Sequence, residues 1–170
     1  MRRATLSAAF LLPILLGGCH VGDVARKTVT VEQSWPAAAI ETVELNGHNG
    51  MIKVVTGSGN EVHLVAKLRT RHDVGEERVR NFLKAEVEDG TLSIGERRKK
   101  RRRIVMLPFF RAEDASISYT LTVPPRMNLE IWNVNGGMNV AGISGRSNLT
   151  SVNGSIEVST PGGEVTVRLR

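Results

Sequence analysis

The sequence predicts a mostly β protein: a β-solenoid-like (or repeated β-meander) domain with one short amphipathic helix, preceded by a cleaved signal peptide. The phrase Asn-Gly-x-(Ile or Met)-x-Val occurs at 49–54, 135–140 and 153–158, and its last two copies begin eighteen residues apart. Apolar and polar residues alternate within each copy, which is typical of half-buried strands. Asn-Gly tolerates the positive φ of a tight turn, and self-similarity at a short fixed period indicates stacked repeats.

Residues 1–18 have the pattern of a secretory signal. A basic start, Met1-Arg2-Arg3, precedes an apolar run from Ala4 to Leu16 and two glycines. The run is shorter than the roughly 20 apolar residues that a membrane-spanning helix needs. Leu16-Gly17-Gly18-Cys19 resembles the lipobox of bacterial lipoprotein signal peptides, in which the cysteine takes diacylglycerol and becomes the first mature residue. Cys19 is the only cysteine, which excludes an internal disulfide.

The lipobox resemblance implies a protein anchored by lipid to the bacterial cell envelope, facing the periplasm or the surface. The alternative for Cys19 is a small buried thiol. His20 stands where an aspartate would favour the inner membrane, so the outer membrane is favoured. Residues 19–39 are expected to form a tether and a first short strand at 28–31, because that stretch alternates and is β-branched.

Positive charge is concentrated in one segment. The net charge is +6 from 23 basic and 17 acidic residues; without Arg2 and Arg3 it is 21 − 17 = +4, and without a further seven charges it is −3. Those seven lie in a predicted loop, 96–110, and either form a solvated surface or contact anionic lipid or an envelope polymer. The export signal argues against nucleic acid as the partner. The seven residues are Arg97, Arg98, Lys99, Lys100, Arg101, Arg102 and Arg103.

The β-strand-repeat domain is expected to span 40–170. A three-strand meander with one apolar face is predicted over 40–67, followed by an amphipathic helix at about 75–84. A hairpin around Asp89-Gly90 comes next. A clean alternation from Ile117 to Val123 ends at Pro124-Pro125, which cannot donate to a strand ladder. The repeats fill the rest of the chain.

In their order, these pieces resemble a known family. They are Asn49 to Val54, Asp89-Gly90-Thr91-Leu92, Leu121-Thr122-Val123-Pro124, Asn135 to Val140 and Asn153 to Val158. This order is similar to that of the bacterial β-strand-repeat proteins of unknown function known as "putative adhesins". The resemblance covers about Ile40 to Arg170. It implies an elongated, solenoid-like domain on the bacterial envelope, and it brings no catalytic residues.

The inventory of reactive side chains gives little support to an enzyme. A β-solenoid carbohydrate-cleaving enzyme needs clustered acids. Beyond Asp114 the only acids are Glu130, Glu157 and Glu164, and Glu157 with Glu164 is the one pair to consider as acid and base. The four histidines lack the spacing that zinc requires, so neither a metal nor a cofactor is predicted.

Two further features have both a structural and a functional interpretation. Asn49, Asn135 and Asn153 are expected to stack as a ladder in the turns and to bond backbone groups of neighbouring repeats; the rival is a row facing a ligand. Trp132 has the opposite phase to Leu129 and Ile131, so it faces away from the core. The favoured interpretation is that the helix or Phe109-Phe110 packs over it, and the alternative is an exposed contact residue.

The sequence thus favours a non-catalytic, adhesin-like or scaffolding lipoprotein of the cell envelope. The alternative is an envelope-stress or anionic-membrane interaction module that uses the basic loop. A carbohydrate-active β-solenoid enzyme is the least supported of the three.

Overall fold

The computed structural model describes residues 26–71, 75–95 and 115–170. These residues form β-strands, one α-helix and one short 3-10 helix, with the following bounds: β1 Lys27–Pro36, η1 Ala37–Ala39, β2 Thr42–Asn49, β3 Ile52–Thr56, β4 Glu61–Thr70, α1 Glu76–Phe82, β5 Ala85–Glu88, β6 Thr91–Gly95, β7 Ala115–Val123, β8 Asn128–Asn135, β9 Met138–Ala141, β10 Ser147–Asn153, β11 Ile156–Ser159 and β12 Val165–Leu169. The mostly β class with one short helix is confirmed.

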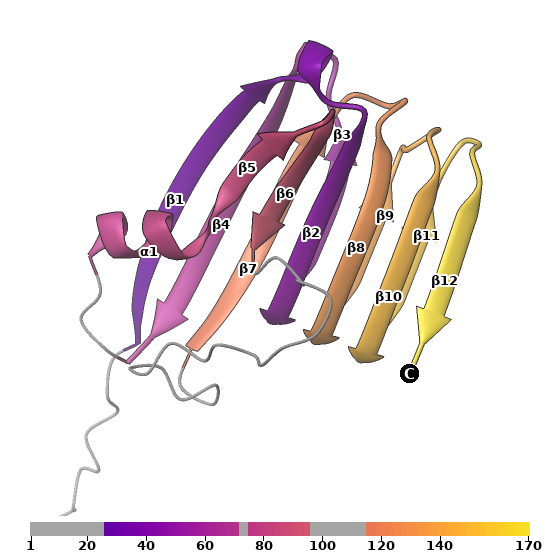
Figure 1. The fold of residues 1–170 in the computed structure, drawn as a ribbon. Coiled ribbons are helices and arrows are strands. Elements are labelled where there is room, and N and C mark those ends of the chain that lie inside the picture. Colours follow the sequence, from indigo (N-terminus) through magenta and orange to yellow (C-terminus); the bar gives the residue numbers. More distant parts are fainter. Residues whose placement is uncertain (1–25, 72–74, 96–114) are drawn as a thin grey trace, which may run out of the picture.

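The described strands form two six-stranded sheets that pack face to face (Figure 1). Sheet A has the order β1-β4-β7-β3-β9-β11, and sheet B has the order β12-β10-β8-β2-β6-β5. Both sheets are mixed, with parallel pairs beside antiparallel ones, and they are not closed on one another. The core lies between them and is made of the inward-facing aliphatic residues of both sheets.

The repeated phrase builds stacked two-strand units. Each unit runs along sheet B, turns at Asn-Gly, and continues in sheet A: β2 to β3, β8 to β9, and β10 to β11. The last two units lie parallel with an offset of eighteen residues, so Leu129 lies opposite Ser147, and Met138 lies opposite Ile156. Ile52 of the first unit also lies opposite Met138. Aliphatic residues at the same position in the phrase therefore stack on one another.

The meander predicted over 40–67 is wrong. β2 lies in sheet B, whereas β3 lies in sheet A between β7 and β9, so β3 and β4 are not neighbours. The Asn-Gly turn does not reverse the chain within one sheet; it carries the chain across the core from one sheet to the other. Gly50, with φ 141°, allows this crossing, because a side chain there would overlap the backbone of Ile117.

The strand expected at 28–31 is longer than predicted. β1 extends from Lys27 to Pro36 and pairs antiparallel with the whole length of β4. Val31 in its middle is buried in the core. β-structure is therefore present well before Ile40.

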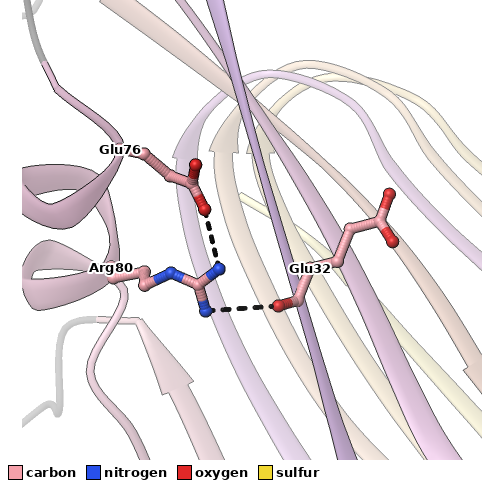
Figure 2. A network of polar contacts seen from close by, with 3 residues as sticks. All are labelled: Glu32, Glu76 and Arg80. Atoms are coloured by element: carbon pink, nitrogen blue, oxygen red, sulfur yellow. Dashed lines mark hydrogen bonds and ion pairs between the residues drawn. The ribbon is translucent and has the colours of Figure 1, made fainter.

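The predicted helix and hairpin are confirmed. α1 lies within the predicted 75–84, at the end of the sandwich beside β1 (Figure 1). Val79 of the helix and Leu83, which follows its last residue, are buried in the core. Arg80 of α1 donates to Glu76 Oε1 at 2.7 Å and to the backbone carbonyl of Glu32 in β1 at 3.5 Å. Figure 2 shows both contacts. β5 and β6 pair antiparallel around the Asp89-Gly90 turn. None of the helices in the described ranges has the length and apolar character to cross a bilayer.

Candidate functional site

The outward face of sheet B presents a strip of side chains around Trp132. In β8 the buried residues Leu129, Ile131 and Asn133 face the core, so Glu130 and the half-buried Trp132 face outward. Pairing is in register, which places Trp132 between Asn46 of β2 and Thr150 of β10. Neighbouring strands lie about 4.8 Å apart, so the faces of these three side chains form one continuous row.

A second row of the strip is acidic. Glu130 lies directly beside Glu44 of β2, one step along the strands from Trp132. Glu44 is oriented by its neighbours: Asn46 Nδ2 donates to its Oε1 at 3.1 Å, and Ser93 Oγ donates to its Oε2 at 3.4 Å. An aromatic side chain and hydrogen-bond acceptors thus lie on neighbouring positions of one sheet face.

A shallow depression continues the strip toward the start of the same strands. It is lined by Thr42, Asn128, Leu129, Glu130, Arg146 and Asn148. Arg146 Nε lies 3.2 Å from Glu164 Oε2, and the Arg146 backbone N–H donates to Asn128 Oδ1 at 3.0 Å. These groups offer donors and acceptors for hydrogen bonds, which suit a polar ligand lying along the face.

The predicted asparagine ladder is present, and it includes bonds from amide to amide. Asn135 Nδ2 donates to Asn49 Oδ1 at 2.6 Å, and Asn153 Nδ2 donates to Asn135 Oδ1 at 3.0 Å. The three amides therefore bond one another across the stacked units. Each carbonyl oxygen in such a ladder accepts from the next unit, which ties the turns together.

Sequence reasoning missed the residue that does bond the backbone of neighbouring units. Asn133 is fully buried, and its Nδ2 donates to the carbonyl oxygens of Gly50 at 3.0 Å and Gly136 at 3.3 Å. Gly47, beside it in register, leaves the room that this side chain occupies. The sequence did carry a signal for this role: Asn133 stands two positions after Ile131, so the alternation of β8 places this polar side chain toward the core.

Glu157 and Glu164 have separate partners on separate sheets. Glu157 is exposed on β11 of sheet A and accepts from Asn139 Nδ2 at 2.9 Å, as expected for a residue that points away from the core. Glu164 precedes β12 of sheet B and pairs with Arg146. His63 lies on the outer phase of β4, with Nδ1 2.9 Å from Ser34 Oγ. The described ranges contain no cluster of three or more metal-ligating side chains.

The remaining predicted site residues lie outside the described residues. These are Cys19 and the seven basic residues from Arg97 to Arg103, and Phe109-Phe110 lies outside as well. α1 packs against β1, at the edge of the other sheet, so it is not the cover that was considered for Trp132. The outward phase of Trp132 is thus observed, while its role as a contact residue stays a prediction.

No protein-family model matches this chain, and no curated protein matches it. Among solved structures, a "putative cell adhesion protein" from Clostridium sporogenes is 14% identical over 85% of this chain and 100% of its own, with a TM-score of 0.38. A "putative adhesin" from Bacteroides fragilis is 9% identical over 86% and 99%, with a TM-score of 0.32. A "putative lipid binding protein" from Parabacteroides distasonis is 11% identical over 81% and 62%, with a TM-score of 0.35. At these scores the likenesses establish neither a shared fold nor a shared function, and the family resemblance stays a prediction.

Proposed function

We propose that this protein is a non-catalytic, adhesin-like or scaffolding module of the bacterial cell envelope, anchored by lipid on Cys19. The signal-like residues 1–18 and the lipobox support the address, and His20 favours the outer membrane. Two or three acyl chains, at about 0.8 kcal/mol per buried methylene, suffice for stable anchoring. In this proposal the stacked units form a short solenoid-like segment that displays a rigid contact face.

The observation that carries the proposal is the strip on sheet B. The proposed ligand is a glycan chain of the envelope, because the ring of Trp132 can pack against the apolar face of a sugar while Glu44 and Glu130 accept from its hydroxyls. A strip on in-register strands is flat and extended, which suits a polymer better than a small molecule.

Cosedimentation with isolated peptidoglycan sacculi, an insoluble envelope glycan, tests the contact face. The full-length protein in neutral vesicles is expected to bind, and Trp132→Ala to lower the bound fraction about tenfold. Trp132→Phe should retain part of the binding, because it keeps a ring. Val55→Ala, a half-buried outward residue on sheet A, is the control. Equal binding by Trp132→Ala and wild type would sink the glycan proposal. Release of soluble sugar would favour the enzyme alternative.

The anchor is tested separately, by incorporation of labelled palmitate. Wild-type protein is expected to carry the label and to sediment with membranes, while Cys19→Ala carries none and is soluble after cell lysis. Label on Cys19→Ala would refute the lipidation site without bearing on the strip.

The seven consecutive charges from Arg97 to Arg103 favour a second function, contact with an anionic membrane. Each Lys or Arg near such a surface contributes about 1 kcal/mol. Replacing all seven by glutamine is expected to abolish the difference in binding between vesicles with and without phosphatidylglycerol. Unchanged binding would retire this function.

A further inference from the structure

The last strand of sheet B exposes residues that have the phase of core residues. Val165, Val167 and Leu169 of β12 lie opposite Ser147, Leu149 and Ser151 of β10, all of which are buried. Val167 and Leu169 are nevertheless 46% and 67% exposed. β12 is the end strand of sheet B: β10 lies along one of its edges, and no described strand of the sheet lies along the other (Figure 1).

The backbone of β12 also has hydrogen-bonding groups directed away from β10. One unit earlier, the N–H of Leu129 donates to the carbonyl of Arg146 at 2.8 Å, and the N–H of Ser147 donates to that of Glu164 at 2.8 Å. Val165 holds the equivalent place in β12, so its N–H points onward from the sheet, as do those of Val167 and Leu169 by alternation along a parallel strand. Among the strands that the structure describes, these three residues thus combine apolar side chains with a backbone edge that no other strand pairs.

We propose that β12 pairs with β12 of a second copy of this chain, antiparallel about a two-fold axis at Val167. This register sets Val167 against its own equivalent and Val165 against Leu169 of the second copy, so the apolar residues meet on the core side. On the outward side it sets Arg168 against Thr166 of the second copy, which avoids opposed like charges. The strand is therefore complementary to itself, as a two-fold contact requires.

The other edge strands lack this self-complementarity. In β5, antiparallel self-pairing would bring Glu86 and Glu88 of two copies together. In β11 it would set Glu157 against itself or against a neighbouring serine, over only four residues. β1 ends at Pro36 and is in contact with α1. Charge in β5, the short length of β11, and Pro36 with the α1 contact in β1 thus leave β12 as the edge that a second copy joins.

Disulfide trapping in membranes of cells producing the full chain tests the axis directly. Equivalent residues of a hydrogen-bonded antiparallel pair lie about 5.5 Å apart between Cα atoms, within disulfide range. Val167→Cys is expected to give about tenfold more covalent dimer on mild oxidation than Val87→Cys. Val87 is a matched control because it is 44% exposed and lies on the edge strand at the other end of sheet B. Equal dimer yields from the two variants would overturn the proposal.

A second experiment does not depend on a disulfide. Two differently tagged copies of the full chain are co-expressed, and one is captured after mild detergent extraction. Val167→Lys in both copies is expected to lower co-capture about tenfold, because it sets two ammonium groups against each other. Val87→Lys should leave co-capture unchanged. Retained co-capture with Val167→Lys, in protein whose circular dichroism matches wild type, would also overturn the proposal.

Discussion

The two ends of the sandwich use the same alternating strands but differ in what lies over them. At the α1 end, Val79 and Leu83 are 2% and 0% exposed, and the short helix lies beside β1. At the β12 end, Val167 and Leu169 have the same inward phase as buried residues of β10, yet much of their surface is open. The alternation along a strand decides which face of the sheet a side chain lies on. Whether that side chain is buried depends on whether another element packs over it.

The core-facing residues of sheet B, compared across neighbouring strands, become less apolar toward the β12 end. Across three strands of sheet B, one row runs from Val43 through Leu129 to Ser147. Ser147 and Ser151 are buried, and in the described part of the chain their hydroxyls have no hydrogen-bond partner. Apolar burial per strand therefore falls toward β12, and we expect this end to be the less stable of the two.

The largest contrast should come from truncating a leucine at each end. Leu83→Ala empties a site in the closed core and is expected to lower the free energy of unfolding by about 3 kcal/mol. Leu169→Ala, measured in dilute protein, should cost less than about 0.5 kcal/mol, because most of that side chain is already in water. Urea denaturation followed by circular dichroism gives both values. Similar losses would show that the β12 end is as well packed as the α1 end.

A glycine substitution between stacked units should have the next largest effect. Gly136 has φ 126°, and a Cβ there would overlap the carbonyl oxygen of Gly50 in the unit below. Gly136→Ala is therefore expected to cost about 2 kcal/mol in urea denaturation. Gly162, in the loop before β12, has open space around it, so Gly162→Ala should be neutral. A neutral Gly136→Ala would mean that the units are not in close contact.

The asparagine ladder should show a smaller gradient between its middle and its end. Asn135→Ala removes two side-chain hydrogen bonds and is expected to cost about 1 kcal/mol, partly offset by water at this exposed site. Asn153→Ala, nearer the β12 end, removes one and should cost about half as much. Thermal unfolding of the two variants side by side measures the difference. A larger loss for Asn153 would contradict the ladder.

The smallest effect should come from the ion pair on α1. The side chains of Arg80 and Glu76 are 47% and 56% exposed, so solvent screens them. Glu76→Gln is expected to lower stability by about 0.3 kcal/mol in low salt, and by less in 1 M salt. A loss comparable to that of Leu83→Ala would mean that the helix is held by charge and not by its buried residues.

Local patterns in the sequence predicted the local structure well. The alternation from Ile117 to Val123, the Asp89-Gly90 hairpin and the helix with Val79 inward are all present, because each depends on neighbours a few residues apart. The outward phases of Glu157 and Trp132 follow from the same two-residue period.

Pairing between distant strands could not be predicted in the same way. The turn at Asn49-Gly50 has the sequence of a hairpin turn, but it crosses between sheets because Ile52 has buried neighbours available in β7 and β9. β1 pairs with β4 across a large sequence separation that no local pattern records. The strip around Trp132 depends on β2 lying beside β8, so its acidic member Glu44 was not foreseen as part of a site.

The eighteen-residue register between stacked units is the central claim, and a pair of introduced cysteines tests it most directly. Asn139 and Glu157 lie opposite each other on β9 and β11, and their side chains are in contact. Asn139→Cys with Glu157→Cys is expected to form an intramolecular disulfide, detected by mass spectrometry, because Cα atoms on adjacent strands are about 4.8 Å apart. Asn139→Cys with Ser159→Cys, displaced by two residues to about 8 Å, should form little. Equal yields from the two pairs, or a higher yield from the displaced pair, would contradict the stacking.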